Sequence, residues 1–204
     1  MALVSCGRAQ QTTEADPMIG TGFHGHTYPG AAAPYGMVQL SPDTRTEGWD
    51  ACSGYHYDDN TIIGFSHTHL SGTGCADLAD ILFHPSAEAP EKSGTRYGID
   101  PYTFNHKDET AKPGYWAVKL QKAGLVAELT ATKHVGIHRY IYSGSGRYIL
   151  IDLNHALSDD KVDQCSLRQI SDTEICGMRR TQGWVENQTD PFLRQVLAPY
   201  NQFQ

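Results

Sequence analysis

The residues after Gly114 alternate between apolar and polar side chains, and this alternation constrains the fold more than any other feature of the chain. Trp116, Val118 and Leu120 share one face of an extended segment, and the residues between them share the other. Similar segments follow at short spacing, separated by turns rich in glycine and serine. The pattern predicts a meander of antiparallel strands with one buried face. The expected strands are 116–121, 125–132, 135–142, 147–153, 164–170 and 174–182, with a turn at 171–173 between the last two.

Composition supports a mainly β chain, because 20 glycines, 10 prolines and 11 tyrosines among 204 residues favour short strands and tight turns over long helices. We therefore predict an antiparallel β-sandwich with little helix. The formal net charge is −7 and the Lys and Arg residues are scattered singly, which argues against nucleic acid as a partner. No stretch approaches the roughly 20 apolar residues that a membrane-spanning helix needs.

The chain divides into three parts by composition and periodicity. Residues 7–15 are polar and aperiodic, so we expect residues 1–15 to be a signal remnant or flexible tether. Residues 16–188 form the predicted sandwich domain, of which 16–85 are loop-rich and resemble a binding site in composition. Within the domain, 86–114 should be an extended excursion with at most one short strand, near 102–105. The last part, 189–204, is set apart as a tail that could form one or two helical turns.

Four cysteines in the predicted domain show no zinc-ribbon or CxxC spacing. Cys165 and Cys176 lie on successive predicted strands and could pair across a hairpin, although buried thiols are the commoner outcome. A fifth cysteine, Cys6, ends the segment Leu3-Val4-Ser5-Cys6-Gly7, which is similar to a bacterial lipobox. Cys6 is therefore either a lipidation site, which would place the protein in the periplasm or outside the cell, or a free thiol in the tether.

Histidines cluster between residues 24 and 69. His24 and His26, and again His67 and His69, are two residues apart, so each pair faces one side of an extended segment. Two such pairs could ligate zinc, completed by Asp43, Asp77 or Asp80. We favour the alternative, in which these histidines hydrogen-bond backbone carbonyls or sugar hydroxyls, and we predict no metal ligand in the chain.

Trp49 is the best single candidate for contact with a sugar. An indole face stacks on the apolar C–H face of a pyranose, and a neighbouring carboxylate such as Asp50 accepts hydrogen bonds from its hydroxyls. Gly48 and the loop setting favour an exposed ring. The competing interpretation is a tryptophan buried in the sandwich core.

Several consecutive motifs together resemble the N-terminal region of glycoside hydrolase family 92, whose members are calcium-dependent, inverting exo-α-mannosidases. The similarity is strong from residue 16 to about 85, continues to about Gln188 and is lost after it. The segments that carry it are Asp16-Pro17-Met18-Ile19-Gly20-Thr21-Gly22, His24-Gly25-His26-Thr27-Tyr28-Pro29-Gly30-Ala31, Pro34-Tyr35-Gly36-Met37-Val38-Gln39-Leu40-Ser41-Pro42-Asp43, Gly48-Trp49-Asp50, Cys52-Ser53-Gly54-Tyr55-His56-Tyr57 and Ile63-Gly64-Phe65-Ser66-His67-Thr68-His69-Leu70-Ser71-Gly72-Thr73-Gly74.

The resemblance implies an N-terminal β-sandwich that packs on an (α/α)6 barrel, with the active site in the cleft between them. It also implies that the barrel supplies both catalytic carboxylates and most calcium ligands. This chain has no room for the barrel and is interpreted as truncated, so no catalytic residue is assigned and the chain is expected to be inactive alone. Its expected contribution is substrate binding by Trp49 and Asp50 and, less directly, by His24, His26, Tyr55, His67 and His69.

The implied partners are α-mannosides, in N-glycans or mannan, and the missing barrel domain. The implied location is periplasmic or extracellular, with Cys6 as a possible anchor in the outer membrane. Two other functions remain open from the residues: a non-catalytic carbohydrate-binding module, and a zinc-dependent hydrolase that uses the two His-x-His pairs.

Overall fold

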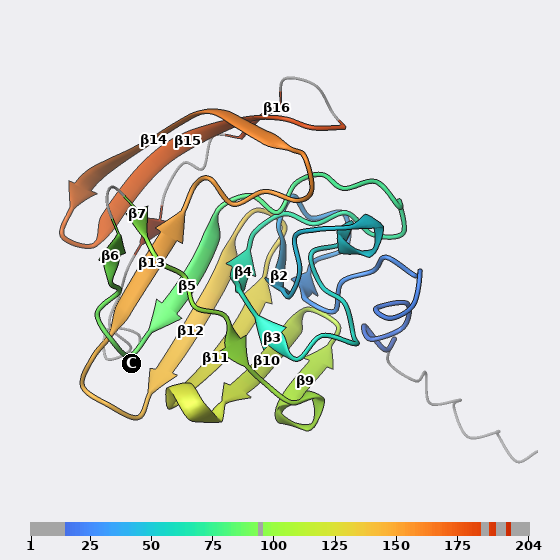
Figure 1. The fold of residues 1–204 in the computed structure, drawn as a ribbon, viewed down its shortest axis with the longest axis horizontal. Coiled ribbons are helices and arrows are strands. Elements are labelled where there is room, and N and C mark those ends of the chain that lie inside the picture. Colours follow the sequence, from blue (N-terminus) through green and yellow to red (C-terminus); the bar gives the residue numbers. More distant parts are fainter. Residues whose placement is uncertain (1–14, 94–95, 185–187, 191–194, 197–204) are drawn as a thin grey trace, which may run out of the picture.

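The computed structural model describes residues 15–93, 96–184, 188–190 and 195–196 and consists mainly of antiparallel strands (Figure 1). The helical segments in these ranges are single turns of 3-10 helix: η1 (Trp49–Ala51), η2 (His106–Asp108) and η3 (Gln121–Ala123). The predicted fold class is confirmed. Cys6 and residues 1–14 of the predicted tether lie outside the described residues. In the described ranges, no helix has the length and apolar character needed to cross a membrane.

One layer is a five-stranded sheet built mostly from the loop-rich first third of the chain. Its strands run in the order β1-β2-β4-β5-β13, and each pair of neighbours is antiparallel. The bounds are β1 (Ala31–Ala32), β2 (Gln39–Asp43), β4 (Gly64–Ser66), β5 (Leu82–Ser86) and β13 (Tyr148–Asp152).

The second layer is a four-stranded meander in the order β12-β11-β10-β9. Trp116, Val118 and Leu120 are buried, as the alternation predicts, and lie in one apolar cluster with Leu40 and Phe65 of the first layer. Burying these faces against each other removes apolar surface from water and stabilises the sandwich. The bounds are β9 (Glu109–Lys112), β10 (Tyr115–Leu120), β11 (Leu125–Ala131) and β12 (Gly136–Tyr142).

A long hairpin of β14 (Lys161–Ser171) and β15 (Glu174–Gln182) arches over one end of the two layers (Figure 1). Its turn follows Ser171, as predicted, and its open end brings Lys161 opposite Gln182. Two short strands pair with β15, namely β16 (Gln188–Asp190) and β17 (Gln195–Val196). The helical turns predicted after residue 189 are wrong for these two segments, and 191–194 and 197–204 lie outside the described residues.

Three local predictions need correction. Strand β13 does not continue the meander, because it pairs with β5 and thereby belongs to the first layer. The excursion 86–114 holds more than one strand: β6 (Lys92–Ser93) pairs with β7 (Arg96–Tyr97), β8 (Tyr102–Thr103) pairs with β3 (Thr61–Ile62), and β9 joins the meander. Cys165 and Cys176 are free thiols and not cross-strand partners, since Cys165 faces Arg179 and Cys176 faces Arg168. The favoured outcome of buried thiols is also wrong, because Cys165 is exposed and Cys176 is half-buried.

Candidate functional site

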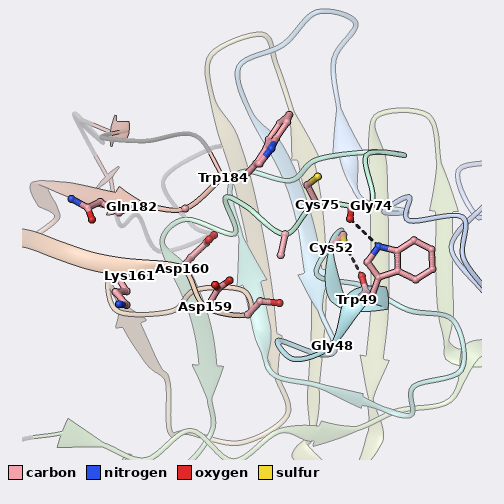
Figure 2. A pocket seen from close by; sticks show the side chains of 13 residues that line it. Gly48, Trp49, Cys52, Gly74, Cys75, Asp159, Asp160, Lys161, Gln182 and Trp184 are labelled. Carbon is pink, nitrogen blue, oxygen red and sulfur yellow. Dashed lines mark hydrogen bonds between the residues drawn. The ribbon is translucent and has the colours of Figure 1, made fainter.

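A pocket of about 780 Å³ lies where the loops of the sandwich meet the open end of the β14–β15 hairpin (Figure 2). One wall is η1 with Gly48, and a second is the loop 74–76. A third is the segment 158–161 that leads into β14, and the last is 182–184 at the end of β15. The pocket therefore collects side chains from four segments that are far apart in the sequence.

Trp49 borders this pocket with 59% of its surface exposed. Its indole N–H donates a hydrogen bond to the carbonyl oxygen of Gly74 at 2.9 Å, which fixes the ring plane. The His24 and His26 rings lie against it, with centroids 4.9 and 4.5 Å away. The expectation of an exposed Trp49 is met, and the ring offers an apolar face beside polar groups.

Asp50 follows Trp49 in η1 and holds both histidines of the first pair. The same carboxylate oxygen, Oδ1, lies 2.8 Å from His24 Nδ1 and 2.8 Å from His26 Nε2. Hydrogen bonds from His24 and then His26 hold the pKa of Asp50 below its ordinary value. The His26 side chain is only 4% exposed and the His24 side chain is 46% exposed, so the cluster opens to solvent on the His24 side.

The opposite side of the pocket is acidic. Asp159, Asp160 and Lys161 line it together with Trp184, which is 64% exposed (Figure 2). Burial, then the charges of Asp77 and Asp159, raise the pKa of Asp160 to about 7. The pocket therefore presents two exposed indole rings and a carboxyl group that changes charge near neutral pH.

The second histidine pair does not reach the pocket. His69 is 3% exposed, and its Nε2 lies 2.8 Å from Oδ1 of the fully buried Asp43. The other oxygen of Asp43 lies 3.1 Å from His155 Nε2. Burial alone would raise the pKa of Asp43, but the charge of His69 and hydrogen bonds from both histidines hold it well below its ordinary value. This cluster joins β2 to two later loops.

His67 lies between the two layers, beside Phe83 and His138. Its Nε2 is 3.1 Å from His138 Nε2, and its Nδ1 is 3.0 Å from the carbonyl oxygen of Ile81. The Tyr140 hydroxyl lies 2.7 Å from His138 Nδ1. One tautomer set satisfies all three contacts: Tyr140 donates to His138, His138 donates to His67, and His67 donates to Ile81. Burial lowers the pKa of both imidazoles, that of His67 to about 4.

Tyr55 is fully buried in the core, and its hydroxyl donates to Glu109 at 2.9 Å. Burial, followed by the charge of Glu109, raises the pKa of Tyr55 far above its ordinary value. Of the expected substrate-binding residues, the structure thus gathers Trp49, Asp50, His24 and His26 at the pocket margin. It places Tyr55, His67 and His69 in the interior, and it does not bring the two His-x-His pairs around one point.

Sequence reasoning missed Trp184 and Asp160. Trp184 follows Gly183, the same glycine-tryptophan signal that pointed to Trp49, so it could have been found. Asp160 carries no comparable signal, because its raised pKa depends on burial and on the approach of Asp77, which is distant in the sequence.

The family model described as the glycosyl hydrolase family 92 N-terminal domain matches residues 15–201. The chain belongs to glycoside hydrolase family 92. The resemblance predicted from the motifs of residues 16–85 is confirmed, and the match continues past Gln188.

Solved family 92 structures and a curated relative agree with this assignment. The chain is 39% identical to a family 92 α-mannosidase from Bacteroides thetaiotaomicron in complex with mannoimidazole, with a TM-score of 0.77 over 85% of this chain and 23% of that chain. It is 27% identical to a second family 92 glycosyl hydrolase, ccman5, with a TM-score of 0.68 over 85% of this chain and 24% of that one. An uncharacterised secreted glycosidase from Arthroderma benhamiae is 29% identical over an alignment of 149 residues, which covers 68% of this chain and 19% of the relative.

The chain thus spans about a fifth to a quarter of the length of these family 92 relatives. Its fold corresponds to the N-terminal domain of glycosidases of this family.

Proposed function

We propose that this chain forms the substrate-facing wall of an inverting exo-α-mannosidase that acts on mannose-containing glycans, N-glycans or mannan. The observation that carries the proposal is the exposed ring of Trp49 at the pocket, with its N–H already bonded and Asp50 beside it. A pyranose stacks its C–H face on such a ring, while neighbouring carboxylates and imidazoles bind its hydroxyls. The relative crystallised with mannoimidazole is described as an α-mannosidase, which supports mannose as the sugar.

Sugar contact is assigned to Trp49, Asp50, His24 and His26. Of these, His26 is least able to touch a ligand directly, because its side chain is 4% exposed and already contacts Asp50. Trp184, Asp159 and Asp160 face the same pocket and extend the binding surface beyond the predicted residues.

The chain alone should bind without hydrolysing. An inverting glycosidase needs a carboxylic acid and a carboxylate roughly 6.5 to 9.5 Å apart, on opposite sides of the scissile bond. The family resemblance implies that both belong to the barrel domain. An assay of the purified chain on α-linked manno-oligosaccharides should therefore show no turnover above a Trp49→Ala control, and turnover that depends on Trp49 would overturn this part of the proposal.

Calorimetric titration tests the binding. Mannose or a short α-manno-oligosaccharide should saturate the chain at millimolar or tighter affinity, and Trp49→Ala should abolish the heat. A non-catalytic carbohydrate-binding module would also show saturation without turnover. This second candidate function is favoured by the pocket, whose walls all come from this chain. Lack of saturation at any accessible concentration would count against both.

Calcium is assigned to the full-length family enzyme, with ligands mostly outside this chain. Ca²⁺ prefers six to eight oxygen ligands. Across the described ranges, the three His, Cys, Asp or Glu side chains whose ligand atoms all lie within 4.8 Å of one another are His24, His26 and Asp50, which offer two nitrogens and one carboxylate. These residues do not fit calcium, and no step is assigned to it here.

A location outside the cytoplasm completes the proposal, in the periplasm or the extracellular space, with Cys6 as a lipid anchor. The relative described as a secreted glycosidase supports export, and the lipobox-like segment before Cys6 supports the anchor. Expression of the natural gene with Cys6→Ala should release the protein from the membrane fraction, and unchanged fractionation would contradict anchoring.

A further inference from the structure

Three potential metal ligands converge beside Trp49. His24 Nδ1 and His26 Nε2 each lie 2.8 Å from Asp50 Oδ1, and the three atoms lie within 4.8 Å of one another. Two imidazole nitrogens and one carboxylate oxygen are a ligand set typical of borderline divalent metals, which in open sites keep a further position for water or substrate.

The backbone that presents the two histidines is constrained. Phe23 and His26 both have left-handed φ values, 51° and 52°, which cost energy for residues with a side chain. A Cβ on Gly25 would lie 2.2 Å from the carbonyl oxygen of Gly20, so the turn between the histidines closes tightly. His56 Nε2 lies 2.9 Å from the carbonyl oxygen of Phe23. These contacts fix the backbone that presents both imidazoles to Asp50.

We propose that His24, His26 and Asp50 bind one divalent transition-metal ion, with zinc as the fitting probe. Four ligands about 2.1 Å from a tetrahedral zinc are roughly 3.4 Å apart, so each N–O separation must grow by only about 0.6 Å. His24 is half-exposed and can make this movement without disturbing the core. The remaining coordination position opens on the His24 side, toward solvent.

Metal binding displaces the protons from the two ligating imidazole nitrogens. Each imidazole must offer a lone pair at the nitrogen that now faces Asp50, so the N–H bonds at these positions are lost and any proton carried there leaves to solvent. The Asp50 carboxylate loses two N–H hydrogen bonds and gains a bond to the metal ion. Binding therefore weakens as pH falls, because protons and metal compete for the same nitrogens. This site goes beyond the proposed sugar binding and uses none of the barrel domain.

Metal titration of the full chain tests the site. Dialysis against Zn²⁺ followed by metal analysis should give one equivalent bound, and His24→Ala or His26→Ala should weaken binding by at least about 100-fold, since each removes one of three ligands. His134→Ala, an exposed histidine far along the chain, is the matched control and should change nothing. Ca²⁺ at equal concentration should not compete, because it prefers oxygen ligands.

Cobalt gives a second readout that locates the ion. Co²⁺ bound at this site should quench the fluorescence of Trp49, whose ring lies 4.5 to 4.9 Å from both imidazoles, and Trp49→Phe should keep the d–d absorption but lose that quenching. Loss of sugar binding in Trp49→Ala, with cobalt binding retained, separates this proposal from the proposed function. A strong thiolate-to-cobalt band, or one-equivalent binding that survives His24→Ala, would overturn the assignment, as would less than stoichiometric binding.

Discussion

The indole N–H of Trp49 donates to the carbonyl oxygen of Gly74, 2.9 Å away, and thereby ties η1 to the loop that forms the next wall of the pocket. The hydrogen bond fixes the ring while leaving 59% of its surface exposed. A ring held in one orientation loses little conformational entropy when a ligand stacks on it, which favours its use as a binding platform.

Replacing Trp49 should separate stacking from orientation. Trp49→Ala removes the platform and should weaken mannoside binding by at least about tenfold, the equivalent of about 1.4 kcal/mol. Trp49→Phe keeps an aromatic face but loses the hydrogen bond to Gly74, so its affinity for the mannoside should lie between that of the wild type and that of Trp49→Ala. Calorimetry measures both. Tyr35→Ala removes an aromatic ring that is 97% exposed and does not line the pocket, and it should bind like the wild type.

Gly54 should tolerate no side chain. Its φ is +72°, and a Cβ there would lie 2.2 Å from Oδ1 of the buried Asp43. Gly54→Ala should therefore lower the free energy of unfolding by several kcal/mol, on the order of the loss expected when a buried ion pair is disrupted. Gly72 has the same φ with nothing within 4 Å of a Cβ, so Gly72→Ala isolates the conformational cost, about 1 kcal/mol. Equal losses in the two variants, measured by urea unfolding, would show that Asp43 does not require this glycine.

The His67–His138 pair should make the domain sensitive to mild acid. Burial lowers the pKa of His67 to about 4 from an ordinary 6.5, and it lowers the pKa of His138 well below its ordinary value. The unfolded chain takes up these protons first, so stability is complete above pH 6.5 and falls as pH is lowered toward 4. We expect a loss of about 2 kcal/mol, allowing for the partial exposure of His67. His138→Phe should reduce the slope of the unfolding free energy against pH between pH 6.5 and 4. An unchanged slope would show that the histidine pair does not cause the acid sensitivity.

Much of the fold follows from local patterns, and the exceptions have physical causes. The buried faces of β10 and β11 follow from a two-residue alternation, which needs no knowledge of the partner sheet. The transfer of β13 to the first layer could not be read from its sequence, because it depends on β5 as a partner. The alternation of apolar and polar residues along a strand specifies which face is buried, but it does not specify which strand is the neighbour.

The candidate site, too, could be predicted only in part from the sequence. Trp49 and Asp50 could be predicted because glycine and a loop setting mark exposed positions, and the structure places them at a pocket. The two His-x-His pairs look alike in sequence, yet one faces Asp50 at the surface and the other is buried with Asp43 and His138. The difference arises from partner residues 24 to 71 positions away in the chain, which no local pattern identifies.

Asp160 should couple the stability of the pocket to pH in the opposite direction from the histidine pair. Its pKa is raised to about 7, through burial and the charges of Asp77 and Asp159, so the folded protein keeps the proton to a higher pH than the unfolded chain does. Stability from this group is therefore complete below pH about 4 and is lost as pH rises through 7. Asp160→Asn cannot ionise, so its melting temperature relative to the wild type should be higher at pH 8 than at pH 4. Asp159→Asn, on an exposed neighbour, should show a smaller difference between the two pH values. If the two variants respond equally, the negative charge of the whole segment, and not the half-buried carboxyl of Asp160, controls the pH dependence of stability.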